Sequence, residues 1–274
     1  MQSVFFMKKY PIILIVLIVA VLTSCSEYQK LLKTNDPELK YNKAVEFFEK
    51  GDFMRASTLF DEVSMYFRGT DKAETLLNYI ARSYMGQKDY YSASEYYRTY
   101  VRTYPKGQFT TEAKFMIGYC FYLESPDVRL DQTATFNAIE AFQEFIDIYP
   151  ESERVPEANK LLDELNDKLA EKYLLNARLY FNLGNYLGNN YLSAVITAQN
   201  ALRRFPATKY REDFGMLILD SKYQQAVMSF ENLKIDRYRD VIDDYYNFIN
   251  DYPAGKFRRQ ADRIFNESKK IVKD

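Results

Sequence analysis

The sequence predicts an all-α fold, a right-handed α-solenoid of about five helix pairs followed by a C-terminal capping helix. An apolar pattern with helical spacing recurs five times, and four of the five copies end at a proline. The composition agrees with this pattern, because aromatic residues make up 16% of the chain while it contains only 9 glycines and 8 prolines. Such a composition is typical of packed helices rather than of a disordered chain.

The repeated unit is clearest in residues 90–105. Ala93 begins a twelve-residue count that ends at Pro105, and Tyr97 and Tyr100 lie four and seven residues after Ala93, on one face of a helix. The proline ends the helix because it has no N–H to donate and because it restricts the residue before it. The stretch is therefore expected to be one helix with an aromatic packing face.

The other copies have the same spacing, with apolar residues four, seven and eleven positions after the first one. The counts run from Ala56 to Arg68, from Ala93 to Pro105, from Ala138 to Pro150, from Ala194 to Pro206 and from Val241 to Pro253. A partner helix precedes each copy, and in the first two copies it carries its own small residue, Ala44 or Ala81. This pattern resembles the tetratricopeptide repeat, in which small residues let antiparallel helices approach and bulky residues fill the layer between pairs.

Cap and turn signals set the expected limits of the helices. Asp36 is expected to cap the first helix, with Pro37 in its first turn. Turns inside the first two pairs are expected at Gly51 and Asp52 and at residues 87–89. In the later copies we expect extra residues at 124–132, a long helix at 155–183, a turn rich in Gly and Asn at 184–190, a turn at 232–236 and a closing helix within 255–273.

The N-terminus, residues 1–24, has the features of a secretory signal. Lys8 and Lys9 precede an apolar run, residues 12–22, that is too short to span a bilayer but suits a signal peptide. A short membrane-anchor helix is the alternative. Removal of the signal would leave a chain with 35 basic and 38 acidic residues, a net charge of −3.

The end of this signal resembles the bacterial lipoprotein box, with Leu22 and two small residues directly before Cys25. The resemblance implies that Cys25 becomes the first mature residue and carries acyl chains that attach the protein to a membrane. Residues 25–36 would then form a lipidated tether. Ser26, where lipoproteins of the inner membrane often have Asp, favours sorting to the outer membrane.

The sequence contains no recognisable catalytic or cofactor chemistry. The absence of His excludes His metal ligands and His general bases, and no phosphate-binding glycine loop, GxSxG or CxxC is present. Cys120 lies in an apolar stretch and is expected to be a small buried residue. The acidic residues are interspersed with Lys and Arg, as on solvated helix faces, and no basic stripe suggests nucleic-acid binding. We therefore expect no enzyme, no cofactor and no metal site.

A solenoid without such chemistry is expected to bind partners along the first helices of its pairs. Aromatic, apolar and a few polar side chains there suit an extended or C-terminal peptide. The candidate contacts on this surface are Tyr41, Asn78, Arg82, Phe115 and Tyr119. The alternative is that these side chains pack between repeats, and for any single tyrosine we favour that alternative.

Arg211 is a further candidate in the C-terminal half. With Lys209, it lies at the expected start of a helix, where a positive charge opposes the helix dipole. An unfavourable local charge suggests a partner, and a local ion pair with Glu212 or Asp213 is the alternative.

The links after three of the prolines also resemble one another, namely residues 105–113, 150–158 and 253–261. Together with the lipoprotein box, the length and the five repeats, they resemble the tetratricopeptide-repeat lipoproteins of the outer-membrane β-barrel assembly machinery. The resemblance covers the whole mature chain, and the long helix at 155–183 resembles the join between the two halves of that family.

The resemblance implies an outer-membrane-anchored scaffold that faces the periplasm. Its N-terminal repeats, residues 37–153, would bind the C-terminal segments of unfolded barrel proteins, and its C-terminal half, residues 154–274, would dock on the BamA-type barrel subunit. Two alternatives stay open. One is a tetratricopeptide adaptor lipoprotein of another cell-envelope complex, in division or secretion, and the other is a SusD-like glycan-binding lipoprotein.

Overall fold

The computed structural model describes residues 27–272, and this part of the chain folds into α-helices and contains no strand. The all-α prediction is therefore confirmed. The chain forms two compact units, the first ending at Leu123 and the second beginning at Glu124. The division lies inside the third helix pair, within the stretched turn, whereas we expected the two halves to divide after that pair, at residue 153.

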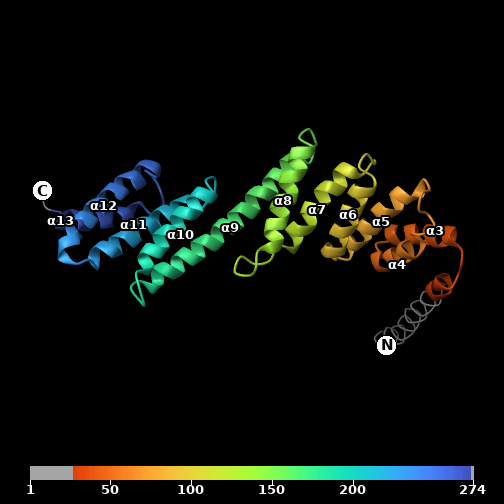
Figure 1. The fold of residues 1–274 in the computed structure, drawn as a ribbon, viewed down its shortest axis with the longest axis horizontal. Helices are drawn as coiled ribbons and strands as arrows, with labels where there is room; N and C mark the ends of the chain where they lie inside the picture. Colours follow the sequence, from red (N-terminus) through yellow and green to blue (C-terminus); the bar gives the residue numbers. More distant parts are fainter. Residues whose placement is uncertain (1–26, 273–274) are drawn as a thin grey trace, which may run out of the picture. The chain divides into compact units, whose positions relative to one another are not determined.

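The first unit is a series of antiparallel helices that pack against their neighbours in chain order (Figure 1). Its helices are α3 (Pro37–Glu49), α4 (Phe53–Val63), α5 (Lys72–Gly86), α6 (Tyr90–Thr103) and α7 (Thr110–Glu124). The pairs α3–α4 and α5–α6 are the first two predicted repeats, and α7 is the first helix of the third.

Side-chain caps fix where several helices begin. Asp36 accepts a hydrogen bond from the backbone N–H of Leu39 at 3.0 Å, as its position before Pro37 predicted. Asp52 and Asp89 cap α4 and α6 in the same way. Each cap satisfies one of the N–H groups that a helix start leaves without a partner, which contributes about 1 kcal/mol.

The core consists of the residues that define the repeat, which confirms the five-copy pattern. The first residue of every count is fully buried, namely Ala56, Ala93, Ala138, Ala194 and Val241. Side chains four and seven positions later are at most 5% exposed in every copy. Ala44 and Ala81 of the partner helices are buried as well, so small residues lie where the two helices of a pair meet.

The second unit continues the alternation with longer helices (Figure 1). Its helices are α8 (Thr133–Ile148), α9 (Val155–Leu183), α10 (Asn190–Arg204), α11 (Arg211–Val227), α12 (Glu231–Asp251) and α13 (Arg258–Ile271). The predicted long helix is confirmed at both ends, and α9 packs against α8, α10 and α11. The closing helix is present as α13, whose buried side chains pack on the core formed by α11 and α12.

The turn predicted at 232–236 is wrong, because these residues lie inside α12. The actual turn is residues 228–230. Ion pairs three residues apart, from Lys234 to Glu231 and from Arg239 to Asp236, suit a helix over this stretch. Arg237 also donates a hydrogen bond to Ser229 Oγ at 2.7 Å, and this contact stabilises the turn at residues 228–230.

Part of the expected tether, residues 27–32, is helical rather than extended. Tyr28 meets the ring of Phe47 edge-on at 5.7 Å between centroids, and Leu31 and Leu32 pack against the core of the first unit. The apolar spacing of these three side chains gives the segment a face to bury. Cys25 and the predicted signal peptide lie outside the described residues.

Candidate functional site

The first unit contains a groove of about 390 Å³. Its lining comes mainly from the first helices of the pairs, α3, α5 and α7, as expected for the binding surface of such a repeat. The lining residues are Phe48, Phe53, Asn78, Arg82, Met85, Tyr97, Phe109, Glu112 and Met116. The structure thus brings the predicted Asn78 and Arg82 together with a largely apolar wall.

Arg82 is the cation available in this groove. Its side chain is exposed, and its guanidinium lies 4.9 Å from the centre of the Phe48 ring, a cation–π contact. Within residues 27–272, no hydrogen bond or ion pair engages this guanidinium. Its N–H donors are therefore free to bind an anionic group that enters the groove, and a carboxylate matches their geometry.

The inner wall of the groove is mainly aromatic, and Glu112 adds a carboxylate to the lining. Phe48 packs on Phe53 and on Tyr79, with ring centroids 5.5 and 5.0 Å apart. Burial raises the pKa of the Tyr97 phenol, and the nearby charge of Arg82 opposes that shift only in part. Tyr97 is therefore a neutral hydroxyl group at physiological pH. Such a surface suits an apolar or aromatic side chain of a ligand.

Three other candidates predicted from the sequence do not line the groove. The ring of Tyr41 lies 5.9 Å from Phe60, and that of Tyr119 stacks on Phe115 at 6.0 Å. Phe115 is only 1% exposed. Cys120 is buried, as expected, and its sulfur lies 3.3 Å from that of Met85.

Sequence reasoning missed the groove residues that come from other elements. Phe53 lies on α4, Tyr97 on α6 and Phe109 on the link before α7, whereas the expectation covered only first helices. The position of Phe53 just after a Gly-Asp turn is the one local signal that would place it near the first helix.

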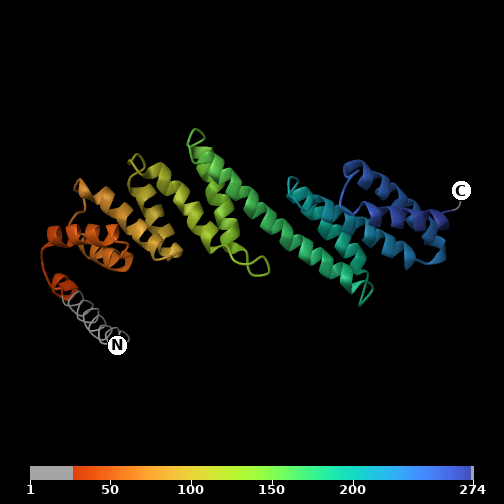
Figure 2. The same ribbon diagram turned by 180° about the vertical axis from the view of Figure 1, so that it is seen from behind.

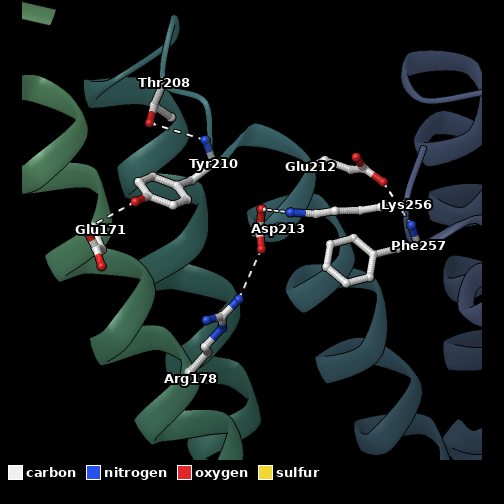
Figure 3. A network of polar contacts seen from close by, with 8 residues as sticks. All are labelled: Glu171, Arg178, Thr208, Tyr210, Glu212, Asp213, Lys256 and Phe257. Atoms are coloured by element: carbon white, nitrogen blue, oxygen red, sulfur yellow. Dashed lines mark hydrogen bonds and ion pairs between the residues drawn. The ribbon is translucent and has the colours of Figure 1, made fainter. Parts of the chain in front are cut away.

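Arg211 is the first residue of α11, and a network of polar contacts is centred on Asp213, two residues later in the same helix (Figure 3). Asp213 is only 8% exposed, and its carboxylate pairs with Arg178 at 3.0 Å and with Lys256 at 2.7 Å. Because these partners come from α9 and from the link after α12, Asp213 ties three elements of the second unit together.

Arg211 does not form the local ion pair with Glu212 or Asp213 that was the alternative prediction. Arg211 donates to the carbonyl oxygen of Pro206 at 2.6 Å, and Arg258 does the same for Pro253 at 3.2 Å. Glu212 accepts from the backbone N–H of Phe257 at 3.0 Å (Figure 3). Arg211 thus supports the link that precedes its own helix while its side chain stays exposed.

A shared device occurs in two of the three similar links, residues 105–113 and 253–261, and also in the link after α10. An acidic side chain on the first helix of one pair accepts a backbone N–H from the link after that pair: Glu74 accepts from Gln108 at 2.7 Å, Asp167 from Lys209 at 3.1 Å and Glu212 from Phe257 at 3.0 Å. The glycines of two links leave room for these carboxylates. A Cβ at Gly107 would lie 2.4 Å from Glu74 Oε1, and one at Gly255 would lie 2.3 Å from Glu212 Oε1.

Many tyrosines have a structural role in hydroxyl–carboxylate pairs. Tyr84 and Tyr96 both donate to Asp61, at 2.9 and 2.8 Å, and Tyr210 donates to Glu171 at 3.1 Å (Figure 3). Burial and the neighbouring carboxylate raise the pKa of Tyr84 and of Tyr210 to about 12. These phenols are therefore packing and hydrogen-bonding groups rather than acid–base catalysts.

The part of the chain that the structure describes lacks two other kinds of feature, a metal cluster and a membrane-spanning helix. Residues 27–272 contain no cluster of acidic or Cys side chains arranged to hold a metal ion. None of the helices in the same range has both the length and the apolar character needed to cross a bilayer.

Comparison with known proteins identifies relatives over most of the chain. Residues 33–229 match the family model YfiO, described as outer membrane lipoprotein. The outer membrane protein assembly factor BamD of Caulobacter vibrioides is 25% identical over 252 residues, covering 86% of this chain and 80% of the relative. The BamD of Rickettsia prowazekii is 23% identical over 148 residues, which span 53% of this chain and 58% of that relative.

Solved structures with some likeness are tetratricopeptide proteins. The TPR2AB domain of yeast Sti1, in its pHSP90 complex, has a TM-score of 0.37 at 12% identity, and the match covers 85% of this chain and 98% of that one. The TPR domain of P58(IPK) has a TM-score of 0.38 at 13% identity, with 92% of this chain and 67% of its own covered.

Proposed function

The chain belongs to the YfiO family of outer membrane lipoproteins, and we propose that it is a lipid-anchored scaffold for assembly of outer-membrane β-barrel proteins. In this proposal Cys25 carries the lipid, and the helical units face the periplasm. The role we propose is binding, because the groove offers apolar walls beside the guanidinium of Arg82 and the carboxylate of Glu112.

The observation that carries the proposal is Arg82 at an apolar groove of the first unit. An unfolded barrel protein offers an extended chain with alternating apolar side chains and, at its end, a free carboxylate. The carboxylate would pair with Arg82 while a terminal aromatic side chain packs against Phe48, Phe53 and Met116. The client is therefore proposed to be the C-terminal segment of an unfolded outer-membrane protein.

The second unit, from residue 124, is proposed to dock on a BamA-type barrel subunit. The exposed Arg211 is our candidate contact there, since its bond to the Pro206 carbonyl occupies only part of its guanidinium. Photo-crosslinking from position 211 in isolated membranes would test this contact. Adducts with division or secretion proteins, and none with the barrel subunit, would assign the chain to another cell-envelope complex.

A peptide-binding assay tests the client groove. A charge-assisted hydrogen bond to a carboxylate contributes about 1.5–3 kcal/mol, so Arg82→Ala should weaken binding of a C-terminal barrel peptide about tenfold or more. A peptide with an amidated C-terminus has no carboxylate to pair with Arg82, so it should bind the wild-type protein and the Arg82→Ala variant equally. Arg98→Ala is the matched control, because Arg98 also lies over an aromatic ring, that of Phe121 at 5.2 Å, but outside the groove. Equal loss with both variants would contradict the assignment.

A further inference from the structure

The second unit has an exposed apolar hairpin tip that the proposed function does not use. Residues 179–202, which include the end of α9, the turn and most of α10, contain no charged residue, although charged residues make up 27% of the chain. Inside this stretch Tyr186 is 68% exposed and Leu187 is 90% exposed. Leu183 and Leu192 beside the turn are exposed as well.

The next pair of helices has a similar tip. In the turn between α11 and α12, Met228 is 61% exposed and Phe230 is 83% exposed. Consecutive antiparallel helices place alternate turns at the same edge, so these two tips lie along one edge of the second unit. Figures 1 and 2 both show the two turns at the lower edge of this unit.

The equivalent turns of the first unit carry charged side chains, although Met54 and Tyr91 just after them are 70% and 67% exposed. The turns contain Lys50 and Asp52 in the first pair, and Lys88 and Asp89 in the second. Lys88 and Leu187 both have a positive φ, 62° and 53°. A residue with such a φ in a turn can therefore be a lysine, and the backbone angle does not require the apolar side chain at 187.

We propose that these two tips, residues 183–187 and 228–233, dock on the surface of a lipid bilayer as a second attachment beside the lipid anchor. Tyr, Phe, Leu and Met are side chains that enter the boundary between headgroups and acyl chains. The side chains project from turns and form no concave site, so a flat and deformable surface suits them better than a folded protein partner. Membership of a lipoprotein family places a bilayer within reach of the chain.

The charges around the tips agree with a neutral lipid surface. The first tip has none, and Glu231, the charged residue within the second tip, pairs with Lys234 at 3.0 Å. Arg178, which precedes the uncharged stretch, is held by Asp213 at 3.0 Å. Attachment is therefore hydrophobic and shallow, and it does not depend on anionic headgroups.

Lipidated full chain in protein-free phosphatidylcholine vesicles tests the proposal. Environment-sensitive fluorophores are placed on Leu187→Cys and on Phe230→Cys, and the equivalent position, Lys88→Cys, is the control. The buried Cys120 does not react in the folded chain. Bromine-labelled acyl chains should quench both tip probes about threefold more strongly than the control.

The quenching should be the same at low and high NaCl and should not rise when phosphatidylglycerol is added. Quenching at either tip no stronger than at position 88 would overturn the proposal. So would quenching that requires phosphatidylglycerol, because attachment would then be electrostatic. Neither result would bear on the groove at Arg82, which the peptide assay tests separately.

Discussion

Replacement of Gly107 by Ala probes the device that holds the link at residues 105–113 to the preceding pair of helices. The added Cβ would lie 2.4 Å from Glu74 Oε1 and 2.6 Å from the Tyr100 hydroxyl oxygen. The carboxylate must then move away, and it loses its 2.7 Å bond to the backbone N–H of Gln108 and its contact with Tyr100.

The expected cost follows from these lost bonds. A hydrogen bond to a charged group contributes about 1.5–3 kcal/mol. A Gly→Ala change without strain stabilises by about 0.4–1 kcal/mol through the unfolded chain. Gly107→Ala should therefore destabilise the first unit by about 1–2 kcal/mol. Urea unfolding gives this value, and faster hydrogen exchange at the amide of Gln108 would locate the change in the link.

A double-mutant cycle decides whether the mechanism is correct. In a background with Glu74→Ala and Tyr100→Phe, the atoms that the new Cβ would meet are gone. Gly107→Ala should then be neutral or slightly stabilising. An unchanged cost of about 1–2 kcal/mol in that background would refute the reasoning, because the loss would then come from the backbone and not from the carboxylate.

Three other perturbations test the packing and the ionisable groups. Ala93→Leu should destabilise by about 1–3 kcal/mol or more in thermal or urea unfolding, because the residue is fully buried where two helices meet, whereas the exposed Ala254→Leu should change stability little. Asp213→Asn should cost only about 1 kcal/mol in the same assay, because Arg178 and Lys256 are half exposed and regain water. For Tyr84 and Tyr210 the folded pKa is raised from 10.0 to about 12, so their contribution to stability is complete below pH 10 and is lost as pH rises through 12. Absorbance of tyrosinate during alkaline titration should show a late-titrating group of phenols, which would be missing if these hydroxyls were solvated.

Part of the groove lining could be predicted from the sequence and part could not. The register of the first helices selected Arg82 and Asn78, and both line the groove, Arg82 exposed and Asn78 only 7% exposed. The same register also selected Phe115, which is buried. Whether an aromatic residue at such a position opens to a groove or fills it depends on the neighbouring helix, and that neighbour is distant in sequence.

The spacing of small and aromatic residues determined the helix pairs, their packing faces and the long helix α9, because helical periodicity is a local property that the sequence alone expresses. Cys25 and its surroundings indicated a lipoprotein in the same local way. Only the tertiary structure decided which side chains form the groove at Arg82, which acidic residues hold the links, and that the turn before α12 exposes Phe230. These features depend on contacts between elements that are far apart in the chain. A periodic pattern predicts which face of a helix is buried, but it does not predict which side chains of other helices pack against that face.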